Sequence, residues 1–254
     1  MGVIEGLTEF LPISSTFHLI VTAHLLALPS TDFVKMFEVV IQSGAICALA
    51  LLYTQTLLKD RRLLGLVISS FIPTAIIGLA LDKVIKNVFF EANWLMLSVF
   101  IGMGILFILV ERIIKARQYE LTKTTASMTV GQAIFLGFAQ ACSIIPGVSR
   151  AGSILLPMIV MGYKRSEAAK YTFYLSLPTI FAASALDLYK GRALLLTSGT
   201  NNWLTLGIGF IVSLIVAYAV VKWLIRYLSS HTLEIFGWYR LVVAAILIYF
   251  KVLV

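Results

Sequence analysis

The sequence predicts an all-α polytopic membrane protein, in which six transmembrane helices accompany two opposed re-entrant helical hairpins. Three observations lead to this fold class. Hydrophobic residues make up 60% of the 254 positions and charged residues 13%, with a mean hydropathy of +0.97, whereas soluble domains carry about 45–50% apolar and about 25% charged residues. The charged side chains gather between apolar segments. Two of the apolar segments are interrupted by proline and polar residues.

Six segments are long and apolar enough to cross a bilayer, which takes about 20 mostly apolar residues. They run over 36–57, 63–81, 93–111, 171–189, 203–221 and 236–251. The stretches 2–28 and 129–162 are also apolar, but they are broken at 12–15 and at 146–152. Each half is too short to cross alone, so each stretch is expected to enter and leave the membrane on the same side.

The basic residues predict the orientation. Twelve Lys and Arg fall in the loops at 59–62, 112–128, 163–170 and 222–235, and six fall in the loops at 29–35, 82–92 and 190–202 and at the C-terminus. Cytoplasmic loops carry the excess of Lys and Arg, so the first set is expected inside and both termini outside. The net charge of +8 therefore reflects membrane topology, and no nucleic-acid partner is expected.

A weak internal repeat agrees with this arrangement. The segment PISSTFHL at 12–19 resembles PGVSRAGS at 146–153, with Pro12 opposite Pro146 and Ser15 opposite Ser149. The sequence therefore predicts one integral membrane domain, residues 1–254, built from inverted repeats at about 1–111 and 129–254. Inverted repeats place broken helices and a polar site near the bilayer midplane.

The first break brings acids, hydroxyls and an imidazole together. Glu5 and Glu9 are four residues apart and share a helix face. If a helix restarts near Ser14, its N-terminal amides form an anion site. The side chain of His18 then lies on the same face as the hydroxyl of Ser14 or Ser15. Such a hydroxyl can attack phosphorus while the imidazole takes its proton.

The second break supplies a guanidinium among small residues. Arg150 offers a fork matched to phosphate oxygens, and Gly147 and Gly152 allow close backbone approach. The two carboxylates can hold a divalent cation that shares substrate phosphates. The predicted polyphosphate site has catalytic residues Ser15, His18, Glu9 and Arg150, substrate-binding residues Ser14, Thr16, Ser149, Gly147 and Gly152, and metal ligands Glu5 and Glu9.

Simpler readings remain open for several of these residues. The hydroxyls of the first break can serve only as helix caps, and Arg150 can serve only to pair with a glutamate. Glu38 and Gln42 either line the cavity or bond neighbouring helices. Four charged residues near span ends are expected to be interfacial or paired: Glu111, Asp187, Glu234 and Arg240. Cys47 and Cys142 are expected to be free thiols, and no cleavable signal peptide is expected.

Five motifs carry a resemblance to a known family: GVIEGLTEFLPISSTFHL, FEVVIQSGA, PGVSRAGS, MGYKRSEAAKYTFYLSLP and ALDLYK. Over nearly its whole length the chain resembles undecaprenyl-diphosphate phosphatase, the bacitracin-resistance family of bacterial membranes. The resemblance implies hydrolysis of undecaprenyl diphosphate to undecaprenyl phosphate and inorganic phosphate, which recycles the lipid carrier for cell-wall synthesis. It also implies a divalent cation, Mg²⁺ or alternatively Ca²⁺, and a multi-pass location in the bacterial plasma membrane.

The same resemblance implies individual roles. Ser15 is expected to be the nucleophile, Glu5 and Glu9 to serve the metal or proton transfer, and Arg150 to bind phosphate, in a site open to the outer face. The chain departs from the family pattern at Phe17, where Gly or Ala is usual, and at Ala151 and Ile154, where two hydroxyls are missing. Phe17 is expected either to crowd the site or to face lipid.

Two rival functions follow. The first is a transporter or flippase for a polyprenyl phosphate or small anion, because inverted repeats with broken helices are the usual transporter architecture and a fold does not fix a function. The second is an inactive homologue that only binds the lipid. The Ser15/His18 pair beside two carboxylates favours the hydrolase, since transport needs no nucleophile and base. The sequence leaves the oligomeric state open, a homodimer included.

Overall fold

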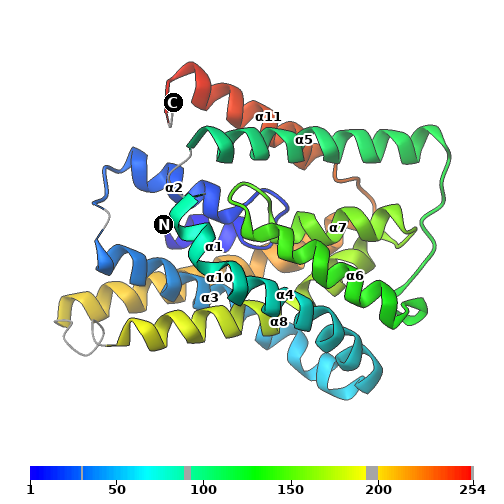
Figure 1. Cartoon of the computed structure of the whole chain (residues 1–254), viewed down its shortest axis with the longest axis horizontal. Helices are drawn as coiled ribbons and strands as arrows, with labels where there is room; N and C mark the ends of the chain where they lie inside the picture. The colour runs from blue at the N-terminus through cyan, green and yellow to red at the C-terminus, as the bar shows by residue number, and fades with distance from the viewer. Residues whose placement is uncertain (30, 89–92, 193–199, 253–254) are drawn as a thin grey trace.

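The computed structural model describes residues 1–29, 31–88, 93–192 and 200–252, with the backbone alone at 82–88, 93, 200 and 201. Within these ranges the chain is helical apart from its turns, and an isolated bridge joins Lys123 to Tyr163. The all-α prediction is therefore confirmed for the described residues. In chain order (Figure 1) the helices are α1 (Gly2–Thr8), α2 (Ser15–Leu25), α3 (Asp32–Lys59), α4 (Arg61–Val88), α5 (Asn93–Ala116), η1 (Thr125–Ser127), α6 (Val130–Ala141), η2 (Cys142–Ile144), α7 (Arg150–Val160), α8 (Arg165–Lys190), α10 (Thr200–Leu228) and α11 (Glu234–Tyr249).

Among the described residues, four helices are long and apolar enough to cross a bilayer. They are α3 over Asp32–Lys59, α4 over Arg61–Leu81, α5 over Trp94–Ala116 and α10 over Asn202–Leu228, which coincide with four of the predicted spans. Large apolar side chains stand exposed along them, for example Ile76, Leu109 and Ile211. Soluble proteins rarely expose apolar surface on this scale, so the chain is a multi-pass membrane protein.

The other two predicted spans form helices of a different character. The segment 171–189 lies in α8, whose first half is buried and includes Thr172 and Ser176. A helix enclosed by protein has less need of an apolar surface. The segment 236–251 becomes α11, whose 16 residues extend about 24 Å at 1.5 Å per residue, less than a hydrocarbon core of about 30 Å. By length and composition, four of the six predicted spans are therefore confirmed among the described helices.

Both predicted breaks are present. Residues 9–14 separate α1 from α2, and η2 with residues 145–149 separates α6 from α7. The second break is shorter than predicted, because Arg150 and Gly152 belong to α7. The helix begins there because the Ser149 side chain caps it, accepting a hydrogen bond of 3.3 Å from the Gly152 backbone N–H.

Cap positions correct the expected alignment of the two breaks. Ser149 is the N-cap of α7, and the N-cap of α2 is Ser14. By cap position Ser149 therefore corresponds to Ser14 rather than to Ser15. Ser15 and Arg150 correspond instead, since each is the first residue of its helix.

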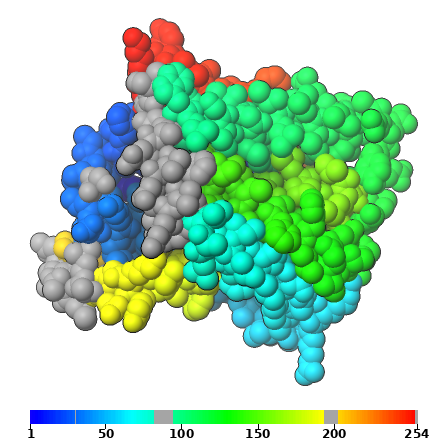
Figure 2. All heavy atoms as spheres, viewed as in Figure 1, coloured from blue at the N-terminus to red at the C-terminus, as the bar shows by residue number. Residues whose placement is uncertain are grey.

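The two short entry helices each pack on a long one. α1 lies against α10, and α6 lies against α4 on the face shown in Figure 2, while α3 contacts both α10 and α8, and α5 runs beside α11 along one edge of Figure 1. Glycines permit the close approach. A Cβ at Gly6 would lie 2.6 Å from the carbonyl oxygen of Ser213, and one at Gly137 would collide with the carbonyl oxygen of Ser70. Each entry helix is thus fixed to a long helix at a glycine.

Phe17 neither crowds the site nor faces lipid. Its side chain is fully buried and stacks on Phe100 of α5, with ring centroids 3.9 Å apart and an interplanar angle of 10°. Both sequence-based alternatives for Phe17 are therefore wrong. The Phe17 ring points across the protein toward α5. It is therefore kept away from both lipid and the break. Ala151 and Ile154 are likewise buried in the core.

Glu111 and Glu234, which the sequence analysis expected to be interfacial or paired, both form ion pairs. The Arg165 guanidinium donates two hydrogen bonds to Glu111, which is almost fully buried. The Arg112 Nε donates to Glu234 at 3.1 Å. Both expected free thiols are confirmed, at Cys47 and Cys142. None of these six side chains takes part in the site described next.

Candidate functional site

The two breaks meet around one small polar cavity of about 40 Å³. Side chains and backbone from both breaks line it, although about 130 residues separate them in sequence. The lining residues are Glu9, Ser14, Ser15, Thr16, Ser143, Ile145, Pro146, Gly147, Val148, Ser149 and Arg150. A further contact ties the breaks together, since the Ser149 hydroxyl donates to the Leu11 carbonyl at 3.3 Å. The structure thus joins the two polar segments that the sequence analysis singled out.

Glu9 is the centre of this cavity. Its Oε1 accepts a hydrogen bond of 2.9 Å from Nη1 of Arg150, and its Oε2 accepts one from the Ser15 hydroxyl. The carboxylate side chain is only 4% exposed, and the Arg150 side chain is 23% exposed. A single carboxylate therefore links the predicted nucleophile of one hairpin to the predicted phosphate ligand of the other.

The helix ends explain why these side chains converge. Ser15 opens α2 and Arg150 opens α7, so two helix N-termini border the same cavity. Among the described residues the Ser14 side chain makes no capping hydrogen bond to the first turn of α2. Its backbone also adopts φ +68°, a conformation that costs an L-residue free energy and recurs at functional sites. The uncapped amides and the Arg150 guanidinium together favour an anion.

His18 does not occupy its predicted place beside the nucleophile. Its Nδ1 lies 2.8 Å from the Ser14 carbonyl oxygen, and its Nε2 lies 2.8 Å from the Tyr239 hydroxyl. A carbonyl only accepts, so Nδ1 donates and Nε2 of the neutral ring accepts from Tyr239. Within the described residues no hydrogen bond joins His18 to Ser15. Glu9 takes the position that the sequence analysis gave to the imidazole.

Glu5 lies one helical turn before Glu9 and is differently placed. It is 1% exposed, and within the described part of the chain both of its carboxylate oxygens lack a hydrogen-bond partner. Buried acceptors without donors are costly, and a cation supplies what they lack. The described residues contain no cluster of three or more acidic, His or Cys side chains suited to a metal. The donor set fits a cation that takes its remaining ligands from substrate phosphate and water.

A larger cavity of about 690 Å³ adjoins the small one at Ser15 and Thr16, which line both. Helices α2, α3 and α8 enclose it. Its lining includes Glu5, Glu38 and Gln42, so the reading in which Glu38 and Gln42 line a cavity is confirmed. Asp187 also lines it, beside Asp32, Lys35 and Lys190. This vestibule connects the buried Glu5 with the polar ends of the helices.

The predicted substrate-binding residues divide into two groups. Ser14, Thr16, Gly147 and Ser149 line the small cavity. Gly147 has φ +96°, and a Cβ there would lie 2.6 Å from the Met96 carbonyl oxygen, so glycine is required. Gly152 lies outside the cavity lining. It allows α7 to approach α5, since a Cβ would lie 2.9 Å from Cζ of Phe107.

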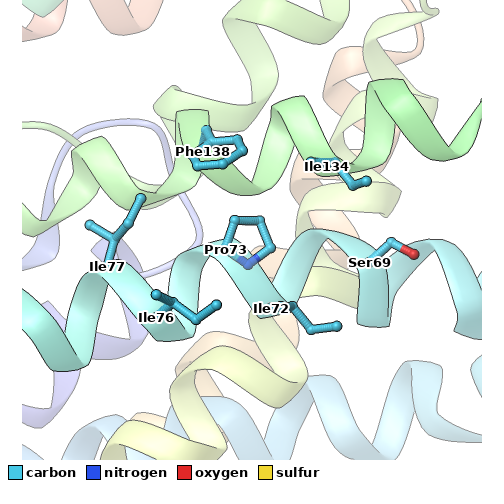
Figure 3. A pocket seen from close by; sticks show the side chains of 7 residues that line it. All are labelled: Ser69, Ile72, Pro73, Ile76, Ile77, Ile134 and Phe138. Carbon is cyan, nitrogen blue, oxygen red and sulfur yellow. The ribbon is translucent and has the colours of Figure 1, made fainter.

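A third cavity, of about 360 Å³, is apolar and opens between α4 and α6 (Figure 3). Ile134 and Phe138 of α6 face Ile72, Pro73 and Ile76 of α4 across it, with Ser69 and Ile77 at its sides. Its described lining holds no charged side chain. This groove therefore lacks the charged side chains that mark the small cavity.

Comparison with known proteins identifies the family of the chain. The sequence matches the family model for bacitracin resistance protein BacA over residues 1–246. The chain belongs to this family. The undecaprenyl-diphosphatase of Aquifex aeolicus (strain VF5) is 40% identical over 246 residues, covering 97% of this chain and 94% of the relative. That of Campylobacter fetus subsp. fetus (strain 82-40) is 39% identical, covering 97% and 95%, and that of Sulfurihydrogenibium sp. (strain YO3AOP1) is 37% identical, covering 95% and 93%.

In this member of the BacA family, two residues beside the breaks were missed. Tyr239 of α11 contacts His18, and the neighbouring Arg240 donates to carbonyl groups of both breaks. A signal for Arg240 was present in the sequence. It and Arg150 are the only two of the 20 Lys and Arg outside the 18 assigned to loops and termini, and ionisable residues at membrane depth are functional candidates by default. The expectation that Arg240 is merely interfacial or paired with an acid is wrong.

Proposed function

We propose that this BacA-family protein hydrolyses undecaprenyl diphosphate to undecaprenyl phosphate and inorganic phosphate at the small cavity, and so returns the lipid carrier to cell-wall synthesis. One observation carries the proposal. Glu9 receives a hydrogen bond from the Ser15 hydroxyl and another from Arg150, which links a nucleophile, a base and a phosphate ligand. Relatives at 37–40% identity bear the name undecaprenyl-diphosphatase.

The first chemical step follows from the Ser15–Glu9 hydrogen bond. The Ser15 oxygen attacks the terminal phosphorus, its proton passes to Glu9, and the bond from that phosphorus to the bridging oxygen breaks. Undecaprenyl phosphate leaves with the proton from Glu9, and a phosphoserine remains. A water molecule then gives a proton to Glu9 and attacks the phosphorus. Inorganic phosphate departs, and the Ser15 oxygen recovers the proton, so the enzyme is regenerated.

Arg150 and the first turn of α2 stabilise the charge on the transferred group. The guanidinium presents a fork of donors to phosphate oxygens, and the uncapped amides after Ser14 add backbone donors. Such preorganised donors are worth about 10²–10³-fold in rate each. The same carboxylate orients both groups before substrate binds, because Glu9 contacts Ser15 and Arg150 at once.

A divalent cation, with Mg²⁺ as the first choice and Ca²⁺ as the second, fits at Glu5. The two unpartnered oxygens of this buried carboxylate support the assignment, and Glu9 is the second acidic side chain within one helical turn. When bound, the cation neutralises diphosphate charge. Glu5 would hold the cation, while both oxygens of Glu9 are already engaged by Ser15 and Arg150.

The membrane arrangement belongs to the same proposal. Helices α8 and α11 cross the bilayer as fifth and sixth spans, α1–α2 and α6–α7 are re-entrant hairpins from opposite sides, and the two halves are inverted repeats. The matched contacts of α1 with α10 and of α6 with α4 support this symmetry. The vestibule then opens to the outer face, where both termini lie. Membrane-impermeant thiol labelling of single cysteines at Lys35 and Lys115 tests it: Lys35→Cys should be labelled from outside and Lys115→Cys only after permeabilisation.

Phosphate release from the C55 and C15 prenyl diphosphates by the purified protein tests the activity. Wild type and a Ser69→Ala control, which alters only the apolar groove, should release phosphate, and Ser15→Ala should not. Acid quenching during turnover should trap a phosphoserine at position 15. Release by Ser15→Ala without a trapped phosphoprotein would replace the covalent route by direct attack of water, and no release by the folded wild type would refute the hydrolase.

The cation is tested separately through Glu5. Titration of Mg²⁺ with the wild type, followed by thermal shift in detergent, should give a saturable stabilisation that Glu5→Gln abolishes. Activity should require the same cation. An unchanged thermal shift in Glu5→Gln would place the metal elsewhere and leave the role of Ser15 untouched.

A further inference from the structure

Arg240 of α11 is a buried cation with no carboxylate partner in the part of the chain that the structure describes. It is 0% exposed. Among the described residues its hydrogen-bond partners are backbone carbonyls, and Nη2 has no partner. The guanidinium also lies over two rings of α5, with Cζ 4.7 Å from the Phe100 centroid and 5.7 Å from the Phe107 centroid. Burying a charge is costly, and an apolar side chain would fill the same space more cheaply. The position therefore asks for a specific donor geometry.

The carbonyls that Arg240 binds belong to the two breaks. Nε donates to the Pro12 carbonyl at 3.0 Å, and Nη1 donates to the Gly147 carbonyl at 2.9 Å. A third hydrogen bond, from Nη1 to the Phe100 carbonyl at 3.3 Å, fixes the same group to α5. One rigid, planar guanidinium thus spans from the turn of the first hairpin to the turn of the second.

These two turns carry the reacting groups. Pro12 lies two residues before Ser14, at the turn from which α2 and Ser15 start. Gly147 lines the small cavity and lies three residues before Arg150. The distance between the turns therefore sets whether Arg150 and Ser15 reach one phosphate group. A displacement of about 1 Å in such a constellation costs about 10²-fold in rate.

We infer that Arg240 is a positioning residue, which holds the two re-entrant turns in register so that Ser15 and Arg150 act on the same phosphate. It acts through the Pro12 and Gly147 carbonyls without touching substrate. The inference rests on the proposed hydrolase function. It assigns to α11 a part in the reaction that the acids and hydroxyls of the hairpins do not reveal.

A double-mutant cycle with phosphate release as the readout tests the inference. Arg240→Lys keeps the charge but loses the fork, so kcat should fall about 10²-fold while KM changes little. In an Arg150→Lys background, Arg240→Lys should lower kcat less than about 5-fold. The side chain at position 150 then no longer acts together with Ser15 on one phosphate, so the register of the turns matters less. Additive losses, or a kcat for Arg240→Lys close to that of wild type, would overturn the inference.

The control is Arg165→Lys, which removes another forked arginine, at the Glu111 pair away from the breaks. It should lower the thermal stability, leave kcat within about 3-fold, and add to Arg150→Lys independently. Arg240→Gln is the second variant, with two donors and no charge, and should resemble Arg240→Lys in kcat. If neither Arg240 variant folds, Arg240 is a folding determinant and the inference is wrong. Absence of turnover in the wild type would instead refute the hydrolase itself.

Discussion

The α1–α2 hairpin and the α6–α7 hairpin share a plan but not their chemistry. In each, a short helix approaches a long one through a glycine, Gly6 beside Ser213 or Gly137 beside Ser70. In each, a break follows, and a second helix begins after a serine at the N-cap. The two hairpins meet at their breaks, which line one cavity, and from there they extend toward opposite sides of the view in Figure 1.

The difference between the hairpins begins three residues after each glycine. That position is Glu9 in the first hairpin and Gln140 in the second. Glu9 lines the cavity and binds Ser15 and Arg150. Gln140 is fully buried and donates to Thr74 and Thr179 at 3.0 Å each. The same place on the scaffold thus holds a cavity-lining carboxylate, the proposed base, in one hairpin and a packing amide in the other.

The first residues of α2 and α7 also differ in chemistry. Ser15 and Arg150 occupy the same first position, so one hairpin contributes the proposed nucleophile and the other the proposed phosphate ligand. The second helix is capped by Ser149, whereas the first is left uncapped at Ser14 among the described residues. The comparison teaches that two helix ends of matching geometry, one capped and one uncapped among the described residues, carry different side chains into one cavity.

The largest effect is expected where the hairpins differ most. Glu9→Gln gives the first hairpin the residue of the second and removes the group that accepts the Ser15 proton. A general base contributes about 10²–10⁴-fold, so kcat for phosphate release should fall about 10³-fold. The loss of the Arg150 ion pair should add a smaller effect on KM. Steady-state kinetics on the C15 diphosphate measure both.

Gln140→Ala is the matched control for this change. It removes two buried hydrogen bonds from the second hairpin, so thermal stability should fall while kcat stays within about 10-fold, since a buried hydrogen bond contributes about 1 kcal/mol. If Gln140→Ala lost as much activity as Glu9→Gln, the asymmetry between the hairpins would be structural and not chemical.

Much of the fold, and part of the candidate site, was predictable from the sequence. The two breaks, the meeting of Ser15 with Arg150 and four of the spans followed from apolar length, charge and the repeat, because backbone polar groups at membrane depth must be enclosed by protein. Helix type and location were therefore predictable from composition. The weakly apolar α8 shows the limit, since burial inside the protein and burial in lipid leave different compositions.

The detailed partners were not predictable. His18 lies three residues after Ser15, which allows a contact, but its ring turns to Tyr239 of α11, 221 residues away. Sequence spacing says nothing of so distant a helix. Ser14 and Ser149 share the N-cap position although their φ angles are +68° and −63°, and the alignment of the two motifs did not reveal it. The role of Arg240 could be inferred only from the positions of both turns.

The next largest effect, on stability, is expected where the second helix of each hairpin, α2 or α7, packs against α5. α2 uses Phe17 stacked on Phe100, and α7 uses Gly152 beneath Phe107. Phe17→Ala, the residue type the family pattern implies, should destabilise the protein by about 3–5 kcal/mol. The apparent melting temperature in detergent should fall on the order of 10 °C. Phe181→Ala, at a ring that is 68% exposed, should change it little, and equal shifts would contradict the anchoring role.

A smaller effect is expected at the glycines that seat the entry helices. Gly6→Ala and Gly137→Ala each drive a methyl group into a backbone carbonyl, and overpacking costs about 1–3 kcal/mol. Gly137→Ala should be the worse, because its contact with Ser70 is the closer. Gly102→Ala, where no described atom lies within 4 Å, should be neutral or stabilising. If both hairpin variants melted like Gly102→Ala, the two entry helices would not be seated through their glycines.

The smallest effect separates the two N-caps. Ser149→Ala removes the hydrogen bond to Gly152 and the contact with Leu11, and a lost cap costs about 1 kcal/mol. Ser14→Ala should leave the melting temperature almost unchanged, because its side chain caps nothing among the described residues. Added phosphate should still stabilise Ser149→Ala against melting, because the uncapped N-terminus of α2 is unchanged in this variant. Equal losses of stability in the two variants would mean that α2 is capped as α7 is, and that its amides are not reserved for a ligand.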